Sequence, residues 1–242
     1  MRRFFTLVLL VLLAPLSAEA SERPIEVHQR LALPQPDARI AALTLDACGG
    51  DYDARLIRFL VQERIPATVF ATRKWIARNP EWVAVLHSHP ELFEIEDHGA
   101  NHVPAVIGVG RRVYGLPGHA DVAHLESEVR NGAAAVESVT GQVPHWYRGA
   151  TAEYDPRALL VIAAIGYKVA GFSVNADAGA TLKREAILAK LNAVSPGDII
   201  IAHMNRPRSD TAEGLSAGLK VLLARGFRFV KLGDTDVRAA LD

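Results

Sequence analysis

The chain has 242 residues, 50% of them hydrophobic, and carries 27 basic and 27 acidic side chains. This length suits one domain with a sizeable core and is short for two. Because the charges balance, we expect neither a nucleic acid nor an acidic membrane surface as a partner. Cys48 is the only cysteine, so an internal disulfide is excluded and stability must come from packing.

Residues 1–20 have the pattern of a secretory signal peptide. Arg2 and Arg3 precede a hydrophobic run over 4–16, and an Ala-x-Ala cleavage pattern ends at Ala20. The run is shorter than the roughly 20 apolar residues of a membrane-spanning helix, and no cysteine follows it to carry a lipid. We therefore expect cleavage and export, with the mature protein in the periplasm or outside the cell and not stably inserted in the membrane.

From Ile40 onward, strand-like and helix-like segments alternate along the chain. Short apolar runs of β-capable residues predict strands, and apolar residues at helical spacing predict helices. The predicted strands cover 41–47, 67–71, 92–95, 145–148, 168–174, 198–202 and 227–232. The predicted helices cover 52–63, 81–86, 123–139, 156–165, 183–193 and 212–224. Residues 103–122 interrupt the alternation, and their glycines and prolines predict a long surface loop.

This alternation amounts to about seven β-α repeats within one domain. It predicts a parallel sheet with helices outside it, either a barrel or a doubly wound sheet. In both architectures the functional groups lie at the carboxyl ends of the strands. The candidate groups at or just beyond predicted strand ends are Asp46, His98, Arg148, Asp177 and His203. Because they share this placement, we expect them to form one active site.

His98 and His102 stand four residues apart, just after the predicted strand at 92–95. On a helical turn, residues at this spacing share a face and can hold one divalent cation. The same spacing also occurs by chance. Two surface or capping histidines near a helix start are therefore the structural alternative.

Five motifs, taken in order, resemble those of the polysaccharide deacetylases of the NodB homology group, or carbohydrate esterase family 4. Residues 44–50, Thr-Leu-Asp-Ala-Cys-Gly-Gly, resemble the first motif, usually Thr-Phe-Asp-Asp-Gly. His98 to His102 matches the metal-binding His-x-x-x-His, whereas 148–151 shares only its arginine with Arg-x-Pro-Tyr. Residues 172–177 resemble the fourth motif, which contains an aspartate, and 200–203 resemble the final Leu-x-His. The resemblance spans roughly residues 41–232. Its specificity comes from the order of the five motifs and not from any one of them.

This resemblance implies a distorted (β/α) barrel with about seven parallel strands over residues 40–242, preceded by an N-terminal extension at 21–39. It also implies metal-dependent removal of N-acetyl groups. The expected substrate is an N-acetylated polysaccharide or cell-envelope glycan. The expected cofactor is a divalent metal ion, with zinc favoured. Such an ion polarises the amide carbonyl and lowers the pKa of bound water toward about 7.

Four residues receive roles from the same resemblance. Asp46 is the expected general base, and Arg148 keeps its carboxylate ionised and oriented. His203 is the expected general acid for the departing amine, and Asp177 holds its imidazolium form. The alternatives are structural: a helix cap for Asp46, a surface ion pair for Arg148, a core position for His203 and an ordinary turn for Asp177.

The chain departs from the family pattern at its second aspartate, a direct metal ligand, which is Ala47 here. A methyl group cannot bind a metal. We predict His98, His102 and Cys48 as the ligands, with Cys48 as a thiolate that favours zinc. Asp46 as the third ligand, and water completing a two-histidine site, are the other possibilities. An inert buried cysteine is the structural alternative for Cys48.

Two other functions fit the same residues. One is hydrolysis of another amide or of a cyclic ureide on the same barrel and metal, as in some relatives of the group. The other is glycan binding without catalysis. In that case the catalytic activity was lost together with the second aspartate and the intact arginine motif. The retention of Asp46, both histidines of the metal pair and His203 argues against a pure binding module, which needs no acid and base beside a cation.

Overall fold

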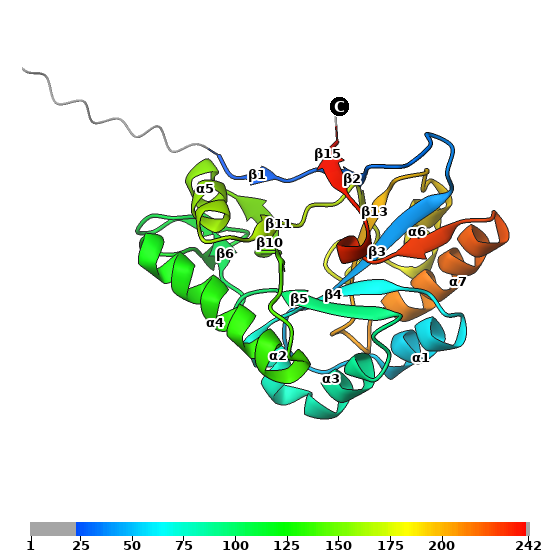
Figure 1. Cartoon of the computed structure of the whole chain (residues 1–242), viewed down its shortest axis with the longest axis horizontal. Coiled ribbons are helices and arrows are strands. Elements are labelled where there is room, and N and C mark those ends of the chain that lie inside the picture. Colours follow the sequence, from blue (N-terminus) through cyan, green and yellow to red (C-terminus); the bar gives the residue numbers. More distant parts are fainter. Residues whose placement is uncertain (1–22, 241–242) are drawn as a thin grey trace, which may run out of the picture.

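The computed structural model in Figure 1 describes residues 23–240 of the chain. The predicted signal peptide at residues 1–20 lies outside the described residues. Within 23–240, no helix combines the length and the apolar character that a membrane crossing requires.

Eight parallel strands form one sheet at the centre of the molecule (Figure 1). Their bounds are β3 Ile40–Ala47, β4 Ala67–Ala71, β5 Phe93–Asp97, β9 Trp146–Tyr147, β11 Lys168–Val169, β12 Val174–Asn175, β13 Ile199–His203 and β14 Arg228–Val230. The sheet order is β11-β9-β5-β4-β3-β13-β12, and β14 pairs with the first residues of β3. Strands that follow one another in the chain are therefore neighbours around the sheet, as in a barrel. The barrel is open between β11 and β12. The predicted distorted barrel with about seven parallel strands is confirmed.

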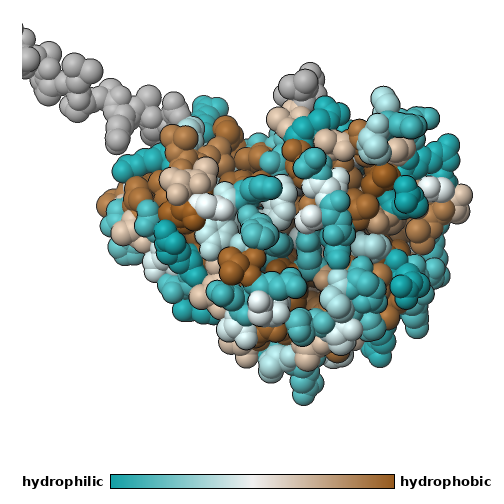
Figure 2. Space-filling view, viewed as in Figure 1, coloured by the Kyte–Doolittle hydropathy of each residue, from teal (hydrophilic) through white to brown (hydrophobic). Residues whose placement is uncertain are grey.

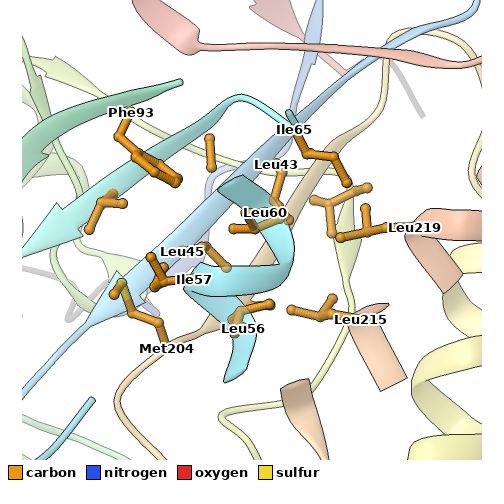
Figure 3. Close-up of a cluster of buried hydrophobic side chains, with 14 of the residues drawn as sticks. Leu43, Leu45, Leu56, Ile57, Leu60, Ile65, Phe93, Met204, Leu215 and Leu219 are labelled. Carbon is orange, nitrogen blue, oxygen red and sulfur yellow. The ribbon is translucent and has the colours of Figure 1, made fainter. Parts of the chain in front are cut away.

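Side chains of the strands alternate between the barrel interior and the surrounding helices, because a strand has a period of two. In β3, Leu43 and Leu45 pack outward against the helices, as Figure 3 shows. Ala42 packs inside the barrel with Phe70. Each fully buried leucine stabilises the fold by about 1.5–3 kcal/mol. This outer layer therefore fixes the register that directs Asp46 inward, at the carboxyl end of β3.

Seven α-helices connect the strands within the described residues. Their bounds are α1 Ala54–Gln62, α2 Arg73–Arg78, α3 Pro80–His87, α4 Val122–Thr140, α5 Pro156–Ala164, α6 Arg184–Asn192 and α7 Thr211–Ala224. Side chains at four helix starts accept hydrogen bonds from first-turn N–H groups, which defines where these helices begin. These caps are Asp53, Thr72, Asp121 and Asp155. Figure 1 shows α1, α2, α3, α4 and α7 along the outer side of the sheet.

Residues 25–31 of the N-terminal extension contact the open side of the barrel. The Gln29 N–H donates to the Phe172 carbonyl (3.1 Å), and the Phe172 N–H donates to the Val27 carbonyl (3.2 Å). The Gln29 side chain adds two bonds to the same backbone segment. These bonds satisfy polar groups that the gap would leave unpaired. The single strand predicted at 168–174 is therefore wrong: the chain changes partners at Phe172, which separates β11 from β12.

Seven short strands form three small sheets beside the barrel. Their bounds are β1 Ile25–Glu26, β2 Gln29–Leu31, β6 Pro104–Ala105, β7 Arg112–Val113, β8 Leu116–Pro117, β10 Ala150–Tyr154 and β15 Val237–Ala239. The predicted surface loop at 103–122 is only partly one. Ala105 is fully buried because β6 pairs with the distant β10, whereas Tyr114, in the β7–β8 hairpin, is 78% exposed.

Hydrophilic and hydrophobic residues are interspersed on the face shown in Figure 2. Hydrophobic residues gather there around α5, the helix that carries the exposed Leu160. Exposed apolar side chains are ordinary on folded proteins, and we draw no functional conclusion from these.

Candidate active site and metal centre

The carboxyl ends of the central strands open into a cavity of about 690 Å³. Because β3 and β13 are paired neighbours, their residues Asp46 and His203 stand opposite each other in register. Both line the cavity, together with Cys48 and His102. His98 is fully buried and contacts Cys48 behind this wall. The predicted groups thus meet at one edge of the sheet, as their positions at strand ends led us to expect.

Cys48, His98 and His102 place one sulfur and two ring nitrogens within 4.8 Å of one another. Cys48 Sγ lies 3.5 Å from His98 Nε2, and the two imidazole centroids are 4.9 Å apart. His98 Nδ1 donates to the Arg148 carbonyl oxygen at 2.6 Å. This bond orients the ring so that Nε2 faces the thiol. One sulfur and two imidazoles are ligands typical of zinc, so the donor set fits that metal.

The turn between the two histidines is not helical. Gly99 and His102 have φ angles of +82° and +61°. These values lie in the left-handed region, which a right-handed helix excludes. The predicted helical turn carrying both histidines is therefore wrong, and the two rings converge through an irregular turn instead.

Arg148 is fully buried and forms an ion pair with Asp46. Its Nη1 lies 2.8 Å from Asp46 Oδ1 and 2.9 Å from Thr44 Oγ1. Its Nε and Nη2 donate to the carbonyl oxygens of residues 170–171, each at 3.2 Å. The guanidinium carbon lies 4.2 Å from the centre of the Phe70 ring. These contacts exclude a surface ion pair and fix the orientation of the Asp46 carboxylate.

Asp46 is buried, and burial alone would raise the pKa of its carboxyl. The charges of Arg148, His98 and His203 outweigh burial and lower that pKa below its usual value, so the group is ionised at neutral pH. Oδ1 is engaged by Arg148, whereas Oδ2 lies 3.8 Å from His98 Nε2. The helix-cap alternative is wrong, because Asp53 caps α1. Asp46 Oδ2 is therefore the oxygen that can take up a proton.

We expect Arg148→Met to destabilise the fold strongly. The substitution keeps a long side chain beside Phe70 but leaves the Asp46 carboxylate buried without its partner. Breaking a buried ion pair from one side costs about 3–5 kcal/mol. Denaturant unfolding of wild type and variant at pH 7 measures this loss.

Arg78→Met is the matched control for that experiment. Arg78 forms an exposed ion pair with Asp51 at 2.8 Å. Exposed pairs contribute about 0–1 kcal/mol, so this variant should unfold almost as wild type does. Equal free energies of unfolding for the two variants would contradict a stabilising role for the buried pair.

His203 is held by Asp177, which is fully buried. His203 Nδ1 lies 2.9 Å from Asp177 Oδ1, and the His203 backbone N–H donates to Oδ2 at 2.8 Å. Thr211 Oγ1 donates to the same Oδ2 at 3.0 Å. Burial would lower the pKa of His203, but Asp177 and Cys48 outweigh it and raise that pKa well above its usual value. The imidazolium thus has Nδ1 engaged by Asp177, and Nε2 is the ring nitrogen that can deliver a proton.

Cys48 directly follows the last residue of β3. Ala47, at the position of the family's second aspartate, packs outward in the hydrophobic core, whereas Cys48 lines the cavity. Burial would raise the pKa of the thiol, but His98, His102 and His203 outweigh it and hold that pKa well below its usual value. The surroundings therefore match a thiolate ligand better than an inert cysteine in an apolar core.

Three residues that support the site escaped the sequence interpretation. Thr44 and Phe70 contact Arg148, and Thr211 contacts Asp177. Thr44 stands two positions before Asp46 in the same strand, so strand alternation could have identified it. The other two meet their partners only through the folding of distant segments, and no local pattern marks them.

The backbone after Arg148 is strained at Thr151, where the family motif has its tyrosine, and at Ala152, the next residue. Thr151 and Ala152 both line the cavity and have φ angles of +69° and +54°. Non-glycine residues in this region cluster at functional sites, because the surrounding structure must hold them there.

Comparison with known proteins identifies a family. The family model described as polysaccharide deacetylase matches residues 34–170, more than half of the chain. No curated protein matches the chain in sequence.

Solved structures share the fold at low sequence identity. A pseudoenzyme of carbohydrate esterase family 4 from Bacillus anthracis has a TM-score of 0.69 and 16% identity over 83% of this chain and 66% of its own. The Bc1960 peptidoglycan N-acetylglucosamine deacetylase has a TM-score of 0.69 and 17% identity over 86% of this chain and 91% of its own. A family 4 carbohydrate esterase from Streptomyces lividans, in complex with acetate, has a TM-score of 0.67 and 20% identity over 84% and 98%. The chain belongs to the polysaccharide deacetylase family.

Proposed function

We propose that this protein is a metal-dependent hydrolase that removes N-acetyl groups from an N-acetylated glycan of the cell envelope. The observation that carries the proposal is that three metal donors meet the Asp46 carboxylate and the His203 imidazole at one site, where the pKa of Asp46 is lowered and that of His203 is raised. Hydrolysis of an unreactive acetamide needs these components together, because the carbonyl must be polarised while one group removes a proton and another delivers one.

Cys48, His98 and His102 would hold the divalent cation, and their sulfur and imidazole donors favour zinc. A cation bound there polarises the acetyl carbonyl and makes water a better nucleophile at neutral pH. His98 must lose its Nε2 proton to bind, although Asp46 and Cys48 outweigh the effect of burial and raise its pKa to about 9. Metal uptake should therefore release protons.

Two residues move the protons of the reaction. Asp46 Oδ2 accepts a proton from water while Arg148 keeps Oδ1 fixed. The water oxygen adds to the carbonyl carbon, and the carbon–nitrogen bond then breaks. His203 Nε2 delivers a proton to the departing nitrogen while Asp177 stabilises the ring from Nδ1. The products are acetate and the free amine of the sugar.

We further propose that the reaction takes place in the periplasm or outside the cell. The signal-peptide pattern over residues 1–20 supports export. The cavity of about 690 Å³ lies within the range of about 300–1,000 Å³ typical of small-ligand sites, which suits binding of a sugar unit.

Glycan binding without catalysis is the second candidate function. It is favoured by Ala47 in place of the aspartate and by the structural likeness to a pseudoenzyme. Hydrolysis of another amide or a cyclic ureide would use the same groups with a different substrate.

Acetate release from the mature protein, residues 21–242, tests these candidates. The protein is assayed with chitooligosaccharides, peptidoglycan fragments and a cyclic ureide, and its metal content is measured by elemental analysis. We expect acetate release that falls after dialysis against a chelator and returns with zinc. Binding of chitooligosaccharides without acetate release, both before and after zinc is restored, would favour the glycan-binding function. Hydrolysis of the cyclic ureide alone would favour a hydrolase of that substrate class.

A further inference from the structure

The residues on both sides of His102 are held by the buried carboxylate of Glu128 in α4. The Asn101 N–H donates to Glu128 Oε1 at 2.6 Å, and the Val103 N–H donates to the same oxygen at 3.3 Å. The side-chain amide of Asn101 donates to Oε2 at 3.1 Å. Glu128 thus binds the residues on both sides of His102.

The backbone conformation of His102 explains why a carboxylate is needed there. Its φ of +61° is left-handed, which is uncommon for any residue except glycine. Successive N–H groups around a left-handed residue form a concave site that binds anions. In this protein the Glu128 carboxylate is the anion, and its charge-assisted hydrogen bonds offset the strain at His102.

Two glycines bring α4 close enough for this contact. A Cβ added at Gly132 would lie 2.1 Å from Asp97 Oδ1 and 2.6 Å from the Gly99 carbonyl carbon. A Cβ added at Gly99 would lie 2.7 Å from Glu128 Oε1. The Ala100 N–H also donates to the Glu128 backbone carbonyl at 3.0 Å. The helix and the turn are therefore in direct contact.

We propose that Glu128 is a positioning residue of the metal centre, whose carboxylate holds the 101–103 turn in the conformation that presents His102 to the metal. Glu128 is not one of the three donors and acts through His102. The inference rests on the proposed metal-dependent function.

Glu128→Gln tests the proposal because it keeps the length of the side chain while removing its charge. It also turns one acceptor into a donor facing the donor groups of the turn. We expect cobalt and zinc affinities to fall about 10–100-fold, as when the hydrogen-bond partner of a metal ligand is lost. The absorption bands of the cobalt-loaded protein should change, and the amides of residues 99–103 should exchange hydrogen faster.

Glu137→Gln, at an exposed position of the same helix, is the control and should bind both metals as wild type does. A folded Glu128→Gln protein with a lower melting temperature but unchanged affinity and cobalt spectrum would overturn the inference, since a purely structural role predicts that result. If Glu128→Gln does not fold, Asn101→Ala takes its place, because it removes only the side-chain bond to Glu128 Oε2. This variant should lose metal affinity to a smaller extent. An unchanged affinity overturns the inference. Wild-type protein that binds no metal would contradict the proposed function as well, so the two failures are distinguishable.

Discussion

Asp46→Asn should reduce acetate release from an N-acetylated glycan by about 10²–10⁴-fold, the range that a positioned general base contributes. Asparagine keeps the shape of the side chain and an oxygen that can accept from Arg148, but it cannot take a proton from water. The loss should fall on kcat rather than KM, because Asp46 acts on the reacting water and does not hold the glycan. Steady-state acetate release from chitooligosaccharides gives both constants.

Metal content separates the role of Asp46 as a base from a role as a ligand. Asp46 Oδ2 lies 3.8 Å from His98 Nε2, so direct coordination is the competing explanation. A base-only role predicts that Asp46→Asn retains its metal, whereas loss of metal would identify Asp46 as a ligand. Asp51→Asn, at an exposed position in the loop that follows β3, is the matched control and should retain full activity. A wild-type kcat for Asp46→Asn would contradict both roles.

The positions of the strand ends were predictable, and with them most of the site. The run Ala41–Leu45 is apolar and β-capable, so Asp46 had to fall where that strand ends. His203 follows the apolar run 199–202 in the same way. Since parallel strands bring their carboxyl ends to one edge, local patterns were enough to place both residues together.

The conformations that complete the site were not predictable, because they depend on contacts between distant segments. The Glu128 carboxylate on α4 binds the turn in which His102 has its left-handed φ. Nothing in the sequence near His102 predicts this contact with α4. The change of partners at Phe172 likewise depends on backbone groups near Gln29, which lie far away in the chain. Local periodicity therefore predicted a helical turn where the folded chain has an irregular turn, and one strand where it has the two short strands β11 and β12.

Cys48→Ser should weaken zinc binding by more than about 100-fold. Losing a hydrogen-bond partner of a metal ligand already costs up to about 100-fold in affinity, and loss of the ligand itself should cost more. A serine hydroxyl is neutral at pH 7 and is a poor zinc ligand, whereas the histidines around Cys48 favour a thiolate. Competition titration with a chromophoric chelator measures the affinity. Acetate release should fall in parallel and recover in part at high zinc concentration if the remaining groups are intact.

Cys48→Asp tells a missing ligand from a general disturbance of the turn. Its carboxylate restores a charged donor one residue after the position where the family has its aspartate. Oxygen donors are harder than sulfur, so this variant should bind zinc more tightly than Cys48→Ser and favour manganese more than wild type does. Equal zinc affinities for wild type and both variants would exclude Cys48 as a ligand. The third donor would then be Asp46, whose Oδ2 lies 3.8 Å from His98 Nε2, or water, and only in the first case would Asp46→Asn release the metal.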